Sequence, residues 1–190
     1  MQEPALRLVD SEDAATAGAV QALADAHFAE VWRLLRRLGL PEADADDAAQ
    51  QVFAITCRRV GSIEPGRGRA FLYGCALRMA AKWRESQQQR VQPTTTGELD
   101  DVDDEVPSLE ELVERRKARA LLDGILDRMP SDLRVVFVLF EFEELDSHEI
   151  AALLEIPRGT VASRLRRARE DFGKRLSRLE KQLRLRGPAR

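Results

Sequence analysis

Hydrophobic residues recur every three or four positions through most of this 190-residue chain. That spacing places them on one face of an α-helix. In the N-terminal half it predicts three helices, over about residues 15–38, 42–60 and 69–89. Gly39 ends the first, and a loop rich in glycine and proline, Gly61–Gly68, separates the other two. The first dozen residues lack the pattern and are expected to be frayed, while the three helices can bury a small core.

The helical spacing stops over residues 91–107, which hold six acidic residues and no basic one. Such a composition cannot bury enough apolar surface to fold, so we predict an acidic flexible linker over residues 91–109. Helical spacing resumes near Ser108 and continues to the C-terminal region. The predicted fold class is therefore all-α, with two small helical domains at residues 15–90 and 110–186 joined by the linker.

Residues 146–169 contain two helical patterns separated by a tight turn. Asp146 is expected to cap the first helix, with Glu149 three residues later completing a capping box. Pro157 ends that helix, because proline disfavours helical geometry in the residue before it. Upstream, Ser131 is expected to cap the preceding helix. The last helix is expected to bury one continuous stripe, formed by Val161, Leu165, Ala168, Phe172, Leu176, Leu179 and Leu183.

The other faces of this last helix carry hydroxyl and guanidinium side chains, namely Ser163, Arg164, Arg166, Arg167 and Arg169. Two helices joined by a tight turn, the second with basic and hydrogen-bonding side chains, have the geometry that fits the major groove of DNA. The alternative is a helix face that is merely solvated. The near absence of acidic residues before Glu170 favours the DNA-binding interpretation.

Composition agrees with a helical protein, since 44% of residues are hydrophobic, 33% are charged, and prolines and glycines number only eight and eleven. The net charge of -3 does not by itself indicate a polyanionic partner. The distribution of charge does, because residues 58–90 and residues 158–190 are strongly basic and flank the acidic segment. Two basic regions in an acidic chain favour a local interaction with a polyanion.

Several kinds of chemistry are disfavoured. Cys57 and Cys75 form no CxxC pair and fall on the apolar phase of their helices, so both are expected to be buried rather than paired or metal-bound. His27 is expected at the edge of the core and His148 at the surface. We find no nucleophile constellation and no glycine-rich phosphate loop, and we predict neither catalysis nor a cofactor. The absence of a signal peptide and of a long apolar run predicts a cytoplasmic protein with no membrane partner.

Three stretches of sequence carry a family resemblance. They are DADDAAQQVF (residues 44–53), RAFLYGCA (residues 69–76), and MPSDLRVVF (residues 129–137) followed by EIA (residues 149–151) and GTVASRLRRAR (residues 159–169). In this order they resemble regions two and four of the sigma-70 family of bacterial transcription initiation factors. The chain is most similar to the small two-domain extracytoplasmic-function group of that family.

The resemblance implies that the helix after the turn enters the major groove of an upstream promoter element. Arginine can bind guanine edges bidentately or grip phosphate. The candidates for the groove-facing surface are Ser163, Arg164, Arg166 and Arg167. Arg158 and Thr160 lie near the helix start, where they suit contacts with phosphate.

In region two the resemblance implies capture of a downstream element as melted single strand, which needs stacking surface and positive charge. The DNA-binding candidates there are Arg69, Arg78, Lys82 and Arg84. The chain departs from the family pattern at Arg78, where many members carry Asn, at Lys82, where Asp or Asn is common, and at Phe71, where Trp is usual. These departures favour a phosphate grip over a specific base contact. Core packing is the stronger interpretation for Phe71 and Trp83.

The resemblance further implies docking to core RNA polymerase through a polar face whose candidates are Asp44, Asp46, Asp47, Gln50, Gln51 and Phe53. The three aspartates could instead favour the positive end of a helix dipole, or bind a hard cation, and a metal is the least favoured of these. The acidic linker suits either a nucleic-acid mimic in the polymerase cleft or a solubilising tether.

The predicted function is therefore a sigma factor whose partners are core RNA polymerase and promoter DNA. A cognate anti-sigma factor is common in the group and is expected here. The alternative is a stand-alone dimeric helix-turn-helix regulator, which would bind a palindromic duplex strongly without polymerase. A metal-dependent hydrolase built on the aspartates is disfavoured.

Overall fold

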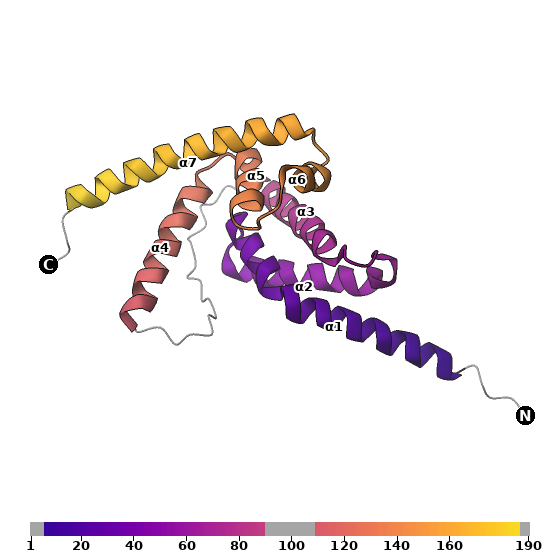
Figure 1. Cartoon of the computed structure of the whole chain (residues 1–190). Helices are drawn as coiled ribbons and strands as arrows, with labels where there is room; N and C mark the ends of the chain where they lie inside the picture. Colours follow the sequence, from indigo (N-terminus) through magenta and orange to yellow (C-terminus); the bar gives the residue numbers. More distant parts are fainter. Residues whose placement is uncertain (1–5, 90–108, 187–190) are drawn as a thin grey trace, which may run out of the picture. The chain divides into compact units, whose positions relative to one another are not determined.

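The computed structural model describes residues 6–89 and 109–186 of the chain (Figure 1). Within these ranges every regular element is helical, which confirms the all-α class. The elements are α1 (Leu6–Arg37), α2 (Glu42–Arg59), the short 3₁₀ helix η1 (Val60–Ser62), α3 (Gly68–Gln89), α4 (Leu109–Asp127), α5 (Ser131–Glu141), α6 (Ser147–Leu154) and α7 (Arg158–Arg186). The predicted linker at 91–109 lies outside the described residues, apart from Leu109, with which α4 begins.

The described residues divide into two compact units, one formed by α1, α2 and α3 and the other by α4 to α7, with the short connection 37–42 grouped with the second. In the first unit, small side chains on α2 let the helices approach closely around an apolar core. Its buried side chains include Val31, Leu34 and Leu35 of α1, Ala45, Ala48, Ala49 and Val52 of α2, and Leu72, Tyr73, Cys75, Ala76 and Ala80 of α3. Gly68, at the start of α3, lies close to α1, because a Cβ there would be 2.7 Å from Cδ2 of Leu23 and would force that side chain to move.

The first helix is longer than its apolar pattern predicts. It begins at Leu6 rather than near residue 15, so the expectation of a frayed start was wrong over residues 6–14. That stretch contains neither proline nor glycine, and its leucine and alanine residues favour helix, so the backbone continues the helix before the apolar periodicity starts. The predicted end is confirmed, since Gly39 has a left-handed backbone with φ 108°.

In the second unit, α5 is the most deeply buried helix and packs against α7. Phe137 of α5 stacks on Phe172 of α7 with ring centroids 5.0 Å apart. The predicted cap at Ser131 was wrong. Pro130 is the N-cap, with ψ 135° and no side-chain hydrogen bond, and Ser131 is already helical. The extended backbone of Pro130 therefore sets the start of α5.

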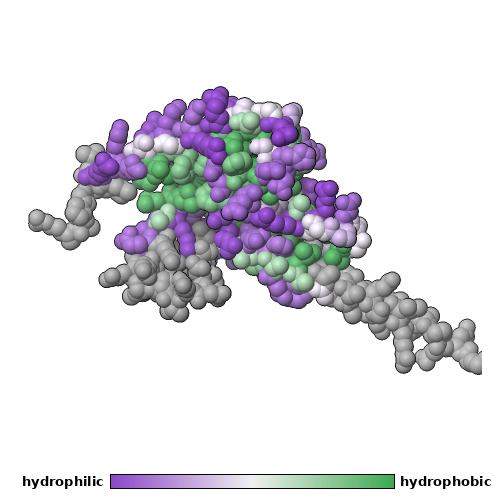
Figure 2. Space-filling view, in the orientation of Figure 1, coloured by the Kyte–Doolittle hydropathy of each residue, from purple (hydrophilic) through white to green (hydrophobic). Residues whose placement is uncertain are grey.

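The apolar stripe of α7 is buried over only part of its length. Val161, Leu165 and Ala168 are buried as predicted, but Leu176 is 38% exposed, which makes the prediction of one continuous buried stripe wrong. At 29 residues, α7 is about 43 Å long. Past Phe172 it borders a cleft of about 380 Å³ with α4. Figure 2 shows hydrophobic surface beneath α7 and mainly hydrophilic side chains along its outer side.

The two cysteines differ in environment. Cys75 is buried as predicted, whereas Cys57 is exposed, so the prediction for Cys57 was wrong. Thr56 is the last buried residue of α2, and the next residue along a helix is turned by about 100°. Cys57 therefore leaves the face that packs against the core.

Candidate nucleic-acid interface

A capping box fixes the start of α6. The backbone N–H groups of His148 and Glu149 donate to Oδ1 of Asp146 at 2.7 Å and 2.8 Å. In return, Oε2 of Glu149 accepts from the backbone N–H of Asp146 at 2.8 Å. Both halves of the predicted box are thus confirmed. The hydrogen bonds from the Glu149 and His148 N–H groups favour the charged carboxylate and lower the pKa of Asp146.

The turn between α6 and α7 is tight (Figure 1). Glu155 closes α6 in a left-handed conformation with φ 54° and ψ 40°, and its N–H donates to the carbonyl of Ala151. The carbonyl of Pro157 then accepts from the N–H groups of Thr160 at 2.8 Å and Val161 at 3.1 Å, which begins α7. These bonds set the direction in which α7 leaves the turn.

The six predicted DNA contacts of this region lie on about the first three turns of α7. Ser163, Arg166 and Arg167 are exposed and lie opposite the buried side of the helix, while Thr160 and Arg164 are half-buried on its flank. Arg158 is exposed at the helix start. The side chains that face away from the core therefore form one polar, basic surface.

The arginines of this surface differ in their partners. Arg166 pairs with Glu170 on the same helix at 2.9 Å, and Arg164 pairs with Asp132 of α5 at 3.5 Å. Arg167 donates through Nε to the carbonyl of Ser163 at 3.4 Å. Within the described part of the chain, no ion pair joins Arg167 to a carboxylate. Its guanidinium therefore has no anion to give up on binding phosphate or guanine.

The predicted contacts of α3 separate into two pairs. Arg78 and Lys82 are exposed one helical turn apart, and half-buried Phe71 lies on the same side of α3. Arg84 is half-buried, donates through Nε to the carbonyl of Ala80 at 3.2 Å, and has its pKa lowered by that burial. Arg69 also points toward its own domain. Arg78 and Lys82 are thus the exposed cations of this set, although Nη2 of Arg78 also donates to Sγ of Cys75 at 3.5 Å.

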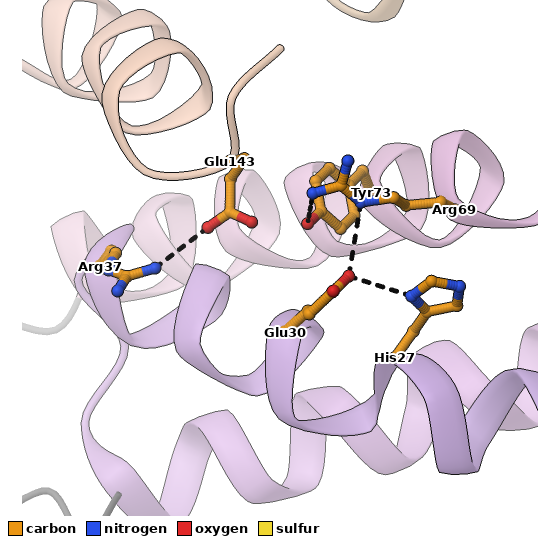
Figure 3. A network of polar contacts seen from close by, with 6 residues as sticks. All are labelled: His27, Glu30, Arg37, Arg69, Tyr73 and Glu143. Carbon is orange, nitrogen blue, oxygen red and sulfur yellow. Dashed lines mark hydrogen bonds and ion pairs between the residues drawn. The ribbon is translucent and has the colours of Figure 1, made fainter. Parts of the chain in front are cut away.

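Arg69 belongs to a polar network that joins α1 to α3 (Figure 3). Its Nε lies 3.4 Å from Oε2 of Glu30, and its Nη2 donates to the hydroxyl of Tyr73 at 3.1 Å. His27 Nδ1 lies 3.0 Å from the same Glu30 oxygen. The sequence reasoning missed this network. The pairs within one helix, His27 with Glu30 and Arg69 with Tyr73, have i,i+3 and i,i+4 spacing. The link from Glu30 to Arg69 depends on how α1 and α3 pack.

Two of the three aspartates at the start of α2 have partners on other helices. Asp44 Oδ2 accepts from the indole N–H of Trp83 in α3 at 2.9 Å. Asp46 Oδ1 accepts from the indole N–H of Trp32 in α1 at 2.6 Å. These bonds fasten the start of α2 to its neighbours. Asp47 is exposed and has no such bond among the described residues.

The remaining docking candidates also separate by position. Gln50 and Gln51 are exposed, whereas Phe53 is buried and packs against Phe28 of α1 with ring centroids 5.6 Å apart. Phe28 itself is 41% exposed. Helical spacing places Gln50, Phe53 and Cys57 on one side of α2. An exposed aromatic edge therefore borders polar side chains on this part of the first unit.

Two other kinds of site, a metal centre and a membrane span, are not found in the described residues. No cluster of three or more His, Cys, Asp or Glu side chains suited to a metal ion occurs among them. Asp44 and Asp46 are bonded to different helices rather than converging on one point. No helix in the described ranges is both long enough and apolar enough to cross a membrane.

Comparison with known proteins agrees with this architecture. Residues 23–90 match sigma-70 region 2, and residues 113–172 match sigma-70, region 4. The chain is 31% identical over 144 residues to the RNA polymerase sigma-H factor of Pseudomonas aeruginosa, covering 70% of this chain and 73% of that protein. It is 28% identical over 140 residues to the ECF RNA polymerase sigma-E factor of Escherichia coli, covering 69% and 73%.

A further relative is longer than this chain. The ECF RNA polymerase sigma factor SigE of Mycolicibacterium smegmatis is 29% identical over 146 residues, which cover 77% of this chain but 57% of that protein. Among solved structures, CnrH in complex with the cytosolic domain of CnrY is similar with a TM-score of 0.64 and 22% identity, covering 87% of this chain and 94% of that one. The sigma factor RpoE in complex with the anti-sigma factor NepR, from Bartonella quintana, gives a TM-score of 0.59 and 18% identity, covering 79% and 91%.

The all-helical fold and the arginine-bearing helix after a capped turn define a helix-turn-helix protein of the DNA-binding class. The order and identity of the two matched regions then specify the family. This chain belongs to the sigma-70 family of RNA polymerase sigma factors, and within it to the extracytoplasmic-function group.

Proposed function

We propose that this chain binds core RNA polymerase and directs it to promoters that contain two separated elements. In this proposal α7 recognises the upstream element, α3 helps to hold the downstream element as melted strand, and the chain itself catalyses no reaction. The observation that carries the proposal is the polar surface of α7, which projects from a turn fixed by the capping box. It occurs in a chain matched by region 2 and then region 4 of one family.

On α7, the exposed side chains Ser163, Arg166 and Arg167, together with the half-buried Arg164, would face the major groove, where an arginine can contact a base edge or a phosphate. Arg158 and Thr160, at the helix start, would contact phosphate, because the first backbone N–H groups of a helix point toward an anion there. A single small recognition surface neutralises few phosphates, so duplex binding by the free chain should be weak and only modestly dependent on salt. Stable promoter binding would then require polymerase.

On α3, Arg78 and Lys82 would grip the phosphates of a melted strand, beside a stacking surface at Phe71. Arg69 and Arg84, which were also predicted to bind DNA, would act instead by holding α3 in place, because their side chains bond within the first unit. Arg78 and Lys82 are both cations, and neither is an amide side chain of the kind common at these positions in the family. Two cations favour binding that depends little on base identity.

For polymerase docking, we propose the side of α2 that includes Gln50 and Gln51 together with Asp47. Asp44 and Asp46 would hold the start of α2 in position through their hydrogen bonds with Trp83 and Trp32. Phe53 would contribute through its contact with Phe28, whose exposed edge can enter an apolar contact.

Three further features belong to the same proposal. The region 2-like domain spans residues 15–90, the acidic linker residues 91–109 and the region 4-like domain residues 110–186. The protein works in the cytoplasm, where the polymerase is. A cognate anti-sigma factor restrains it, and the support for this is that the structurally similar RpoE of Bartonella quintana was solved in complex with the anti-sigma factor NepR.

The decisive experiment is transcription in vitro with core polymerase, this chain and a promoter library. We expect a set of active templates that share two short motifs at a fixed separation. If no template is transcribed above the level of core polymerase alone, the proposal is wrong.

Docking can be measured separately with a label on Cys57, because this cysteine is exposed while Cys75 is buried. A fluorophore there lies on the same side of α2 as Gln50, so core polymerase should change its signal. Gln50→Ala should weaken the response, and Glu85→Gln, an exposed position on another helix, serves as the control.

The dimeric regulator remains the second candidate, favoured by the helix-turn-helix alone. It requires a dimer and a palindromic site. Sedimentation of the free chain with and without duplex distinguishes the two, since a sigma factor should remain a monomer.

A further inference from the structure

An ion pair joins α7 to α5 at the edge of the proposed DNA-contacting surface. Nε of Arg164 lies 3.5 Å from Oδ2 of Asp132, and the two side chains are 28% and 48% exposed. The partner comes from another helix, so its position is set by the packing of α5 on α7, which includes the stack of Phe137 on Phe172. The carboxylate is therefore held by the framework of the second unit rather than by α7 itself.

The contact uses the Nε side of the guanidinium. Within the described residues, no hydrogen bond or ion pair engages the two terminal nitrogens of Arg164, the groups that can donate two parallel hydrogen bonds to a guanine edge. Asp132 lies in the first turn of α5, where the helix dipole favours a negative charge. The carboxylate can therefore remain in place while the far side of the guanidinium binds DNA.

The other arginines of this surface are held differently. Arg166 is paired with Glu170 on its own helix, and Arg167 is bonded to a backbone carbonyl. A flexible arginine can follow phosphates on any duplex, whereas a bidentate base contact needs one fixed orientation of the guanidinium plane. Fixing that orientation in advance lowers the entropy lost on binding. The benefit is larger for the directional base contact than for an adaptable phosphate contact.

We infer that Asp132 is a positioning residue that orients Arg164 for contact with one guanine of the upstream element, and so increases the preference for that base. The inference rests on the proposed function, since it requires α7 to lie in the major groove. Exposed ion pairs contribute little individually, so the expected effect is small, about two- to fivefold in discrimination at that one position.

The test measures base preference with the full chain and core polymerase on a promoter library randomised across the upstream element. Arg164→Ala should remove the preference at one position. Asp132→Asn should relax the preference at the same position about two- to fivefold and leave the other positions unchanged. In the double variant, Asp132→Asn should add nothing, because the two residues act as one unit.

The matched control is Glu141→Gln. Glu141 is also a carboxylate of α5 paired with an arginine of α7, Arg169, at 2.6 Å, but Arg169 is outside the proposed DNA contacts. Glu141→Gln removes one negative charge from α5, as Asp132→Asn does, and should leave every base preference unchanged. Urea unfolding of each variant checks that the second unit remains folded.

The inference is overturned if Asp132→Asn leaves all base preferences unchanged, if it lowers transcription equally on all templates, or if its effect persists in the Arg164→Ala background. These outcomes differ from a failure of the proposed function. In that case the wild-type chain selects no upstream motif at all, and there is no base preference for any substitution to relax.

Discussion

The two basic helices, α3 and α7, make different use of their arginines. Both were predicted to bind DNA, yet α7 presents Arg166 and Arg167 at the surface, whereas α3 turns Arg69 and Arg84 toward its own domain. The first turns of α7 bury one stripe against α5 and α6, and the opposite side of the helix is exposed. α3 packs against α1 and also bonds to α2 through Trp83. A basic helix that supports a core on several sides has fewer cations left to bind a ligand.

The largest expected effect is on α7. Arg167→Ala should lower promoter-directed transcription about five- to 100-fold, the range for loss of a specific arginine contact. Binding to core polymerase should be unchanged, because Arg167 is far in sequence from α2 and lies on the surface. Transcription and the Cys57 fluorescence signal measure the two properties separately.

The control for Arg167 is Arg178→Ala, an exposed arginine beside the cleft between α4 and α7. It should have little effect on transcription. Equal losses for the two variants would show that general positive charge on α7, and not a particular contact, is what matters.

The next effect is on α3 and concerns stability. Arg69→Ala should destabilise the first unit by about 1–3 kcal/mol, since the hydroxyl of Tyr73 loses a charged hydrogen-bond donor and Glu30 loses an ion-pair partner. The exposed Arg78→Ala should change stability by less than about 0.5 kcal/mol. Urea unfolding gives both values. If Arg78 proved as important for stability as Arg69, the contrast between inward and outward arginines on α3 would be wrong.

A smaller effect should separate structure from docking at the start of α2. Asp44→Ala should cost about 1 kcal/mol of stability, because the indole N–H of Trp83 loses its acceptor. Asp47→Ala should leave stability unchanged and weaken polymerase binding. Thermal unfolding measures stability, and the Cys57 signal measures polymerase binding, in both variants. Equal effects of the two substitutions on both measurements would contradict the separate roles of Asp44 and Asp47.

The smallest effect concerns pH at the turn before α7. The pKa of Asp146 is lowered in the folded chain by hydrogen bonds from the Glu149 and His148 N–H groups. The stability that this carboxylate contributes is therefore present above its unfolded pKa, about 3.9, and is lost as pH falls through the folded pKa. Asn also caps helices well, so Asp146→Asn tests the charge alone.

We expect the wild type to exceed Asp146→Asn in stability near neutral pH, and the difference to shrink in acid. Urea unfolding of both chains across this range gives the difference directly. A difference that stays constant with pH would mean that the carboxylate charge does not stabilise α6.

Much of the second unit could be predicted because its determinants are local. The capping box at Asp146 and Glu149 depends on a three-residue spacing, and the buried positions Val161, Leu165 and Ala168 follow one helical stripe. The stripe failed past Phe172 because periodicity reports which face is apolar, not how far a neighbouring helix extends to cover it. The error at Cys57 has a different cause, because this residue is turned by about 100° from Thr56, the last buried residue of α2.

The sequence by itself determined the helical class, the position of the helix-turn-helix and the family, because helix spacing, capping and motif order are properties of neighbouring residues. Only the tertiary structure decided which charged side chains remain available. The pairs Glu30 with Arg69, Asp44 with Trp83 and Asp132 with Arg164 each join different helices. Their partners are chosen by the packing of apolar faces, which brings side chains together regardless of their distance along the chain.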